Sequence, residues 1–212
     1  MSQATLARRE RRALGALLHD LGPDAPTLCD GWTTRDLAAH LYVRENRPDA
    51  AGGIIVRPLA GYLERVQSSV AARPYDEVVD AVANGPRGLS PFALPGVDSA
   101  ANTAEFLVHH EDARRGQPGW QPRELEAADA DRIWRTLPQL TRLATRHVSV
   151  GLVARHPDGR VVTLRKGSPV AVIEGEPLEI LLYLFGRKGA AQVEFTGDEQ
   201  ACAAVRGTDL AV

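Results

Sequence analysis

The hydrophobic pattern of this 212-residue chain changes its period near residue 147. Before that point, apolar residues recur every three or four positions, as on one face of an α-helix, and Pro/Gly turns separate the segments. After it, short apolar runs lie between turn residues, which is typical of β-strands. The change predicts a mainly α fold with a C-terminal α+β part, divided into a helical domain over 1–146 and a small α+β domain over 147–212.

Helices are expected over 3–21, 34–44, 58–72, 76–84, 98–115 and 127–145. The hydroxyl of Thr33 can cap the second helix, and Asp36 suits the positive start of that helix. Pro138 should kink or break the last one, because proline lacks a backbone donor and clashes with the preceding turn. The Pro/Gly-rich segment 84–99 is expected to be irregular and to pack over one end of the helical bundle.

Four strands are expected in the last third of the chain. Two of them flank the turn at 156–159, whose Asp-Gly pair suits a β-hairpin. The run 170–175 predicts a third strand, 176–189 an apolar helix, and 191–198 a fourth strand that a short terminal helix follows.

The charge balance and the cysteines exclude several classes of protein. The formal net charge of −2 and the pI near 6.3 argue against nucleic acid or an anionic membrane as the main partner, since both require a basic excess. No apolar run reaches the roughly 20 residues of a membrane helix, and the N-terminal residues lack the apolar core of a signal peptide. A cytoplasmic protein is therefore expected, with Cys29 and Cys202 as free thiols.

Glu105 and His109 lie four residues apart, which is one turn of an expected helix. Their side chains then point about 40° apart on one face, and Asp112 lies about 20° to the other side of Glu105. That face also carries apolar residues, so it is expected to be partly buried, and a buried carboxylate and imidazole need a partner. His40 lies on the apolar stripe of its own helix. Together, His40, Glu105 and His109 predict a metal site with three protein ligands and a position left for water or substrate.

Other interpretations of these residues stay open. Glutamate–histidine pairs at this spacing also form simple hydrogen bonds, so the three residues could be a satisfied core cluster without a metal. His110 is turned about 100° from His109 and cannot bind the same ion from a regular helix. Asp112 is either a fourth ligand or an acceptor that fixes an imidazole tautomer, and Cys29 either approaches the site or fills a buried position as a small hydrophobe. The other charged residues of this stretch are expected at the solvated surface: Glu111 and Arg114 or Arg115.

Two stretches resemble a known family. The run CDGWTTRDLAAHL at 29–41, followed about 65 residues on by AEFLVHHED, is similar to the N-terminal domain of the actinobacterial mycothiol-dependent maleylpyruvate isomerases, within the wider DinB-like (YfiT-like) metal-binding superfamily. The segment 175–198 is similar to the C-terminal domain of those proteins, so the resemblance spans nearly the whole chain. It implies a DinB-like four-helix bundle that holds a divalent metal, usually zinc, between His40, Glu105 and His109.

The resemblance also implies a function. The family's isomerase uses a low-molecular-weight thiol, mycothiol, whose pKa a metal would lower while it stabilises an enolate as a Lewis acid. We therefore expect a metal- and thiol-dependent transferase or isomerase acting on a small electrophile; the alternative is a non-catalytic metal- or small-ligand-binding protein of the same fold. Arg187 resembles an arginine of the family in placement and is the candidate cofactor contact, unless it pairs with carbonyl groups at a helix end.

Overall fold

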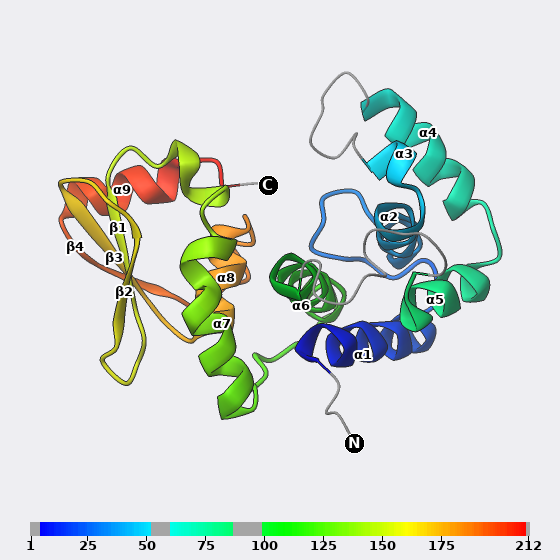
Figure 1. Cartoon of the computed structure of the whole chain (residues 1–212), viewed down its shortest axis with the longest axis horizontal. Helices are drawn as coiled ribbons and strands as arrows, with labels where there is room; N and C mark the ends of the chain where they lie inside the picture. The colour runs from blue at the N-terminus through cyan, green and yellow to red at the C-terminus, as the bar shows by residue number, and fades with distance from the viewer. Residues whose placement is uncertain (1–4, 52–59, 87–98, 211–212) are drawn as a thin grey trace. The chain divides into compact units, whose positions relative to one another are not determined.

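The chain forms two compact units in the computed structural model, which describes residues 5–51, 60–86 and 99–210. Unit 1 spans Met1–Gln121 and unit 2 spans Pro122–Val212. The described part of unit 1 is helical, whereas unit 2 combines helices with a four-stranded sheet (Figure 1). The expected fold class, mainly α with a C-terminal α+β part, is confirmed.

Unit 1 is a bundle built from α1 (Leu6–Leu21), α2 (Thr34–Asn46), α3 (Pro48–Ala51), α4 (Ala60–Ala71), α5 (Tyr75–Asn84) and α6 (Ser99–Arg115). α1 packs against α5 and α6, and α2 packs against α4 and α5 (Figure 1). Their apolar faces meet in one core whose fully buried members include Leu14, Leu18, Leu37, Leu41 and Phe106. Each such side chain contributes about 1.5–3 kcal/mol when buried. This shared core fixes the positions of α2 and α6, which carry the candidate site.

The helices of unit 1 begin and end close to the expected residues. α2 continues two residues beyond the expected end at 44, and α5 begins one residue before the expected start at 76. Residues 58–59 of the expected third helix, and most of the irregular segment 84–99, lie outside the described residues. No helix formed by the described residues combines the length and the apolar character needed to cross a bilayer.

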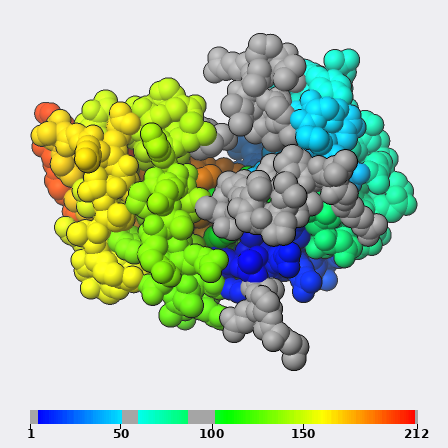
Figure 2. Space-filling view, in the orientation of Figure 1, coloured from blue at the N-terminus to red at the C-terminus, as the bar shows by residue number. Residues whose placement is uncertain are grey.

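Unit 2 contains α7 (Ala127–Leu140), a 3₁₀ helix (Ala144–His147), β1 (Gly151–Arg155), β2 (Val161–Arg165), β3 (Val170–Glu174), α8 (Pro177–Leu184), β4 (Glu194–Gly197) and α9 (Glu199–Gly207). The strand order is β2-β1-β3-β4, with β1 and β3 parallel and the outer pairs antiparallel. β2, in yellow, lies at the surface of this unit (Figure 2), where Val161 is 60% exposed.

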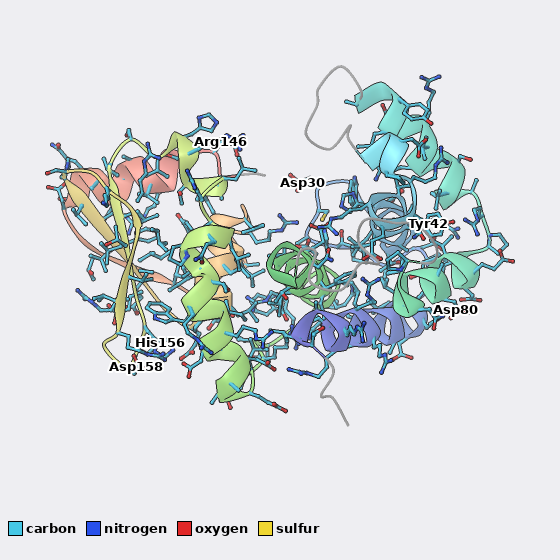
Figure 3. All side chains as sticks on the ribbon, in the orientation of Figure 1. Asp30, Tyr42, Asp80, Arg146, His156 and Asp158 are labelled. Atoms are coloured by element: carbon cyan, nitrogen blue, oxygen red, sulfur yellow. The ribbon has the colours of Figure 1, made fainter. Side chains whose placement is uncertain are left out.

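Two local expectations for unit 2 are confirmed. The hairpin forms between β1 and β2, where Gly159 has a φ of 92° that side-chain-bearing residues rarely adopt. His156 and Asp158, labelled in Figure 3, mark its turn. The expected break near Pro138 also occurs, since α7 ends at Leu140 and a short 3₁₀ helix follows.

The division between the units lies earlier in the chain than the expected boundary at 146/147. Unit 2 already begins at Pro122, so it includes α7. This helix packs against α8 and β2, and its residues Ile133, Trp134 and Leu137 are buried. Helical periodicity identifies the type of an element but not its packing partner. The change of period therefore marks the start of the strands, not the start of the unit.

Candidate metal centre

α2 places His40 in the interior of unit 1. A capping box fixes the start of this helix, because the backbone N–H and the hydroxyl of Thr33 donate to Asp36 Oδ2 at 2.9 and 2.8 Å. The indole ring of Trp32 lies 5.1 Å from the imidazole ring of His40. Only 13% of the His40 side chain is exposed. The capped helix start and the indole contact together restrict the orientation of the imidazole.

α6 supplies the other two predicted ligands. His40 Nε2 lies 3.2 Å from Glu105 Oε1, and His109 Nε2 lies 3.4 Å from the same oxygen. The two imidazole rings are 5.1 Å apart at an angle of 68°. One potential ligand atom from each of the three residues lies within 4.8 Å of the others. The structure therefore brings together, from two helices, the three side chains that the sequence singles out.

Asp112 and Cys29 extend the cluster on the other side of the His109 ring. His109 Nδ1–H donates to Asp112 Oδ2 at 2.9 Å, which leaves Nε2 facing Glu105. The Cys29 thiol donates to the same Asp112 oxygen at 3.2 Å. Asp112 is fully buried. The contact with His109 is compatible with one of its two expected roles, an acceptor that fixes an imidazole tautomer.

The loop that carries Cys29 is docked on the end of α6. The backbone N–H of Leu28 donates to the carbonyl oxygen of Asp112 at 3.1 Å. A β-carbon on Gly116 would lie 2.5 Å from the carbonyl oxygen of Pro26, so a glycine is needed for this approach. Figure 3 labels Asp30 in this loop and Tyr42 on α2. The docking brings the Cys29 thiol to Asp112.

Arg44 and Asn102 border the cluster, although the sequence pattern does not single them out. Arg44 Nε lies 3.3 Å from Glu105 Oε1, and Arg44 Nη1 donates to Asn102 Oδ1 at 2.7 Å. Arg44 lies one turn after His40 on α2, and Asn102 lies one turn before Glu105 on α6. Helical spacing from the predicted ligands is thus the signal that could have identified both Arg44 and Asn102.

The surroundings of the cluster shift the pKa values of its three titratable groups, and not all in the same direction. Burial lowers the pKa of His40, which favours the neutral imidazole. Burial alone would raise the pKa of Glu105, but hydrogen bonds from His109 and His40 and the charge of Arg44 hold that pKa well below its usual value. Burial would likewise lower the pKa of His109, yet hydrogen bonds with Asp112, Cys29 and Glu105 raise it well above normal. The proton of the cluster therefore rests on His109, between two carboxylates.

The donor set suits a divalent transition metal. Two imidazole nitrogens and one carboxylate oxygen are typical ligands of zinc, and a metal with three protein ligands retains a position for water or substrate. A second set, Cys29, His109 and Asp112, shares the His109 ring and is equally compact. Among the described residues, no buried side-chain nitrogen or oxygen lacks a hydrogen-bond partner. The alternative of a satisfied core cluster therefore stays open on geometry alone.

Other charged residues of α6 are more buried than the sequence indicates. The expectation that Glu111 and Arg115 lie at the solvated surface is wrong, because both are buried and Arg115 Nε donates to Glu111 Oε2 at 2.6 Å. His110 pairs with Glu10 of α1 at 2.8 Å and is not part of the three-residue cluster. α6 packs against α1, and most of its described residues are buried.

Arg187, the candidate cofactor contact, lies in unit 2 just after α8. Its Nη1 donates to the carbonyl oxygen of Phe185 at 2.6 Å, which is the helix-end pairing considered as its alternative role. The positions of the two units relative to each other are not determined, so the structure does not relate Arg187 to the cluster in unit 1. Its contact with a cofactor stays a prediction.

Comparisons with known proteins identify the fold. No family model and no curated relative matches the chain. Among solved structures, it is similar to the crystal structure of the mycothiol-dependent maleylpyruvate isomerase, with 19% sequence identity, a TM-score of 0.52 and 91% of each chain covered. A histidine-to-alanine mutant of such an isomerase gives 20% identity and a TM-score of 0.49, again over 91% of each chain. The expected resemblance is confirmed for the fold: the chain folds like a mycothiol-dependent maleylpyruvate isomerase.

Proposed function

We propose that this chain binds a divalent metal ion, zinc in the first place, through His40, Glu105 and His109. With that ion it acts as a thiol-dependent transferase or isomerase on a small electrophile. The observation that carries the proposal is the meeting of three ligand-type side chains from α2 and α6, all within 4.8 Å. Their chemistry, two imidazoles and one carboxylate, matches a catalytic rather than a closed structural zinc site.

The surroundings of the cluster support this assignment. Asp112 holds His109 in the tautomer whose Nε2 faces the other two ligands. Carboxylate–histidine pairs of this kind orient metal ligands and raise their basicity. Trp32 contacts the ring of His40 and restricts its orientation. A bound divalent ion would supply Lewis acidity, lowering the pKa of a thiol and polarising a substrate carbonyl group.

The thiol enters the proposal through the solved structure with the same fold, which is described as a mycothiol-dependent isomerase. Mycothiol is therefore the proposed cofactor, and Arg187 in unit 2 is its proposed contact. A small-molecule substrate follows from the same likeness. The cytoplasmic location, and the absence of nucleic-acid and membrane partners, stay predictions from composition.

The same cluster is compatible with a non-catalytic metal- or small-ligand-binding protein. One observation favours this second function: Arg187, the candidate cofactor contact, donates to a main-chain carbonyl group at the end of α8. Such a contact stabilises a helix terminus and requires no ligand.

Cobalt-substituted protein distinguishes the two functions. The visible spectrum of bound Co²⁺ changes when a new ligand enters its coordination shell. We expect mycothiol, or a close thiol analogue, to change the spectrum of the wild-type protein. His40→Ala, which lacks one proposed ligand, should give no such response. A wild-type spectrum that stays the same at saturating thiol would support the binding function and contradict the thiol-dependent one.

A further inference from the structure

A second pocket of unit 1 is lined by arginines. It has a volume of about 350 Å³ and lies between α1 and α5, which pack side by side (Figure 1). Arg8, Arg11 and Arg12 line it from α1, and residues 83–86 line it from the C-terminal end of α5 and the two positions after it. No acidic residue, and none of the proposed metal ligands, is among the described residues that line this pocket.

The spacing of the arginines and the packing of α1 on α5 create the pocket. Positions 8, 11 and 12 are three or four apart, so their side chains share one face of α1. A β-carbon on Gly15 would lie 2.7 Å from Ala83 Cβ, which shows how closely the two helices approach. Gly85 then ends α5 with a φ of 81°. The end of α5 is thereby held against the arginine face of α1.

Arg11 is the fixed member of the three arginines. Only 11% of its side chain is exposed, and its guanidinium group donates to both carboxylate oxygens of Glu45. It also donates to the Val82 carbonyl oxygen at 3.1 Å, which offsets the partial negative charge at the end of α5. Its contacts thus serve the packing of unit 1, and Glu45 balances its charge.

Arg8 and Arg12 differ from Arg11, because both are exposed and lie one helical turn apart. Like charges at this spacing repel each other, and a bound anion would relieve that repulsion. Guanidinium groups bind phosphate oxygens through pairs of parallel hydrogen bonds. Among the described lining residues, only Ala83 and Pro86 have apolar side chains. This composition favours a compact anion over a ligand with a large organic part.

We propose that this pocket binds the diphosphate group of a small anion and that Arg8 and Arg12 contact its phosphate oxygens. Each arginine takes one phosphate group, so a diphosphate binds more tightly than a single phosphate. The group can come from free pyrophosphate or from a diphosphate ester. The inference is independent of the proposed metal site, because the pocket and the metal ligands share no described residue.

Calorimetric titration of the full chain with inorganic pyrophosphate, at constant ionic strength, tests the proposal. We expect saturable binding of one pyrophosphate per chain and weaker binding of inorganic phosphate. Loss of one charged donor should weaken pyrophosphate binding about 10-fold in Arg8→Gln and in Arg12→Gln. The double variant should lose more affinity than either single variant. Both positions are exposed on a helix, where glutamine is well tolerated.

Arg65→Gln is the matched control, since it makes the same change of charge elsewhere in unit 1. Arg65 is exposed on α4, where its Nε donates to the Gly61 carbonyl oxygen, and it does not line the pocket. Its substitution should leave the affinity near wild type. ADP is the second probe, and we expect it to bind no more tightly than pyrophosphate. Tighter ADP binding that still requires both Arg8 and Arg12 would assign the diphosphate to an ester and support the site.

His40→Ala distinguishes this pocket from the metal centre, because pyrophosphate also binds metal ions. We expect this variant to bind pyrophosphate like wild type. Binding that is lost in His40→Ala but kept in Arg8→Gln and Arg12→Gln would overturn the proposal. So would a wild-type chain without saturable binding at millimolar pyrophosphate, or equal losses in Arg8→Gln and Arg65→Gln. A wild-type protein that holds no metal would refute the proposed function and leave this inference standing.

Discussion

His109 uses both nitrogens of its ring, and the two contacts depend on each other. Nδ1 donates to Asp112, so Nε2 is presented to Glu105 and to any ion bound there. The one-turn spacing of Glu105 and His109 made their shared face predictable from the sequence. The contact of Cys29 with Asp112 was not predictable in this way, because it depends on how the loop that carries Cys29 docks against α6. The two residues are 83 positions apart in the chain.

Asp112→Asn tests the role of this carboxylate. The substitution preserves the shape of the side chain but removes the charge that keeps the proton on His109 Nδ1. We expect zinc affinity, measured by competition with a chromophoric chelator, to fall about 10- to 100-fold. Cys29→Ser retains a hydrogen-bond donor to Asp112 and should change the affinity less. An Asp112→Asn protein with wild-type affinity would show that Asp112 does not orient the ligand.

The loop before α2 and the C-terminal end of α6 are the two segments that hold the cluster in position. The loop approaches Gly116 so closely that a β-carbon there would meet the Pro26 carbonyl oxygen at 2.5 Å and the Thr27 Cα at 2.7 Å. Sequence periodicity predicted both α2 and α6, and Pro138 correctly predicted the break after α7. Periodicity could not predict the contact of the loop with Gly116, because a glycine near a helix end is equally compatible with a simple helix stop signal.

Gly116→Ala should therefore disturb the packing of the loop. Both neighbours that it would meet are main-chain atoms, which cannot move aside cheaply, so we expect a loss of about 1–3 kcal/mol in the free energy of unfolding. Chemical denaturation measures it. The matched control is Gly61→Ala in α4, where nothing lies within 4 Å, and it should raise helix stability by about 0.5–1 kcal/mol. Equal effects in the two variants would refute the close approach.

The pair Arg11–Glu45 links α1 to α2 in the interior of unit 1. Glu45 is fully buried, and both of its oxygens accept from the guanidinium group of Arg11, which also donates to the Val82 carbonyl oxygen. Arg11→Met would leave a buried carboxylate without its main partner, at a cost of about 3–5 kcal/mol in unfolding free energy. The double variant Arg11→Met/Glu45→Met should lose clearly less. A single variant as stable as wild type would show that this pair does not lock the two helices.

The whole molecule divides at Gln121, and all three proposed ligands belong to unit 1. The sequence predicted the order of the two parts, the helical bundle and the sheet with its helices. It did not predict that α7 belongs to the second part, because the packing of α7 on α8 and β2 is a tertiary preference that periodicity does not encode. The three proposed ligands could be selected from the sequence because each lies on a regular helix.

Metal binding should stabilise unit 1 in particular. Zinc at a free concentration of 100 times its dissociation constant is expected to add about 2.7 kcal/mol to the free energy of unfolding of the unit that binds it. Thermal scans with and without zinc measure this, and a chelator should reverse the shift. His40→Ala should show no zinc-dependent shift. A similar shift in wild type and His40→Ala would place zinc elsewhere on the chain.

Elemental analysis of the purified protein, after loading with zinc and exhaustive dialysis, tests the central claim most directly. The account predicts about one divalent ion per chain, as for a site with three protein ligands, and its loss in His40→Ala. His147→Ala is the control, because this exposed histidine lies outside the cluster, and it should retain the ion. Wild-type protein without bound metal, or His40→Ala with its full complement, would contradict the account.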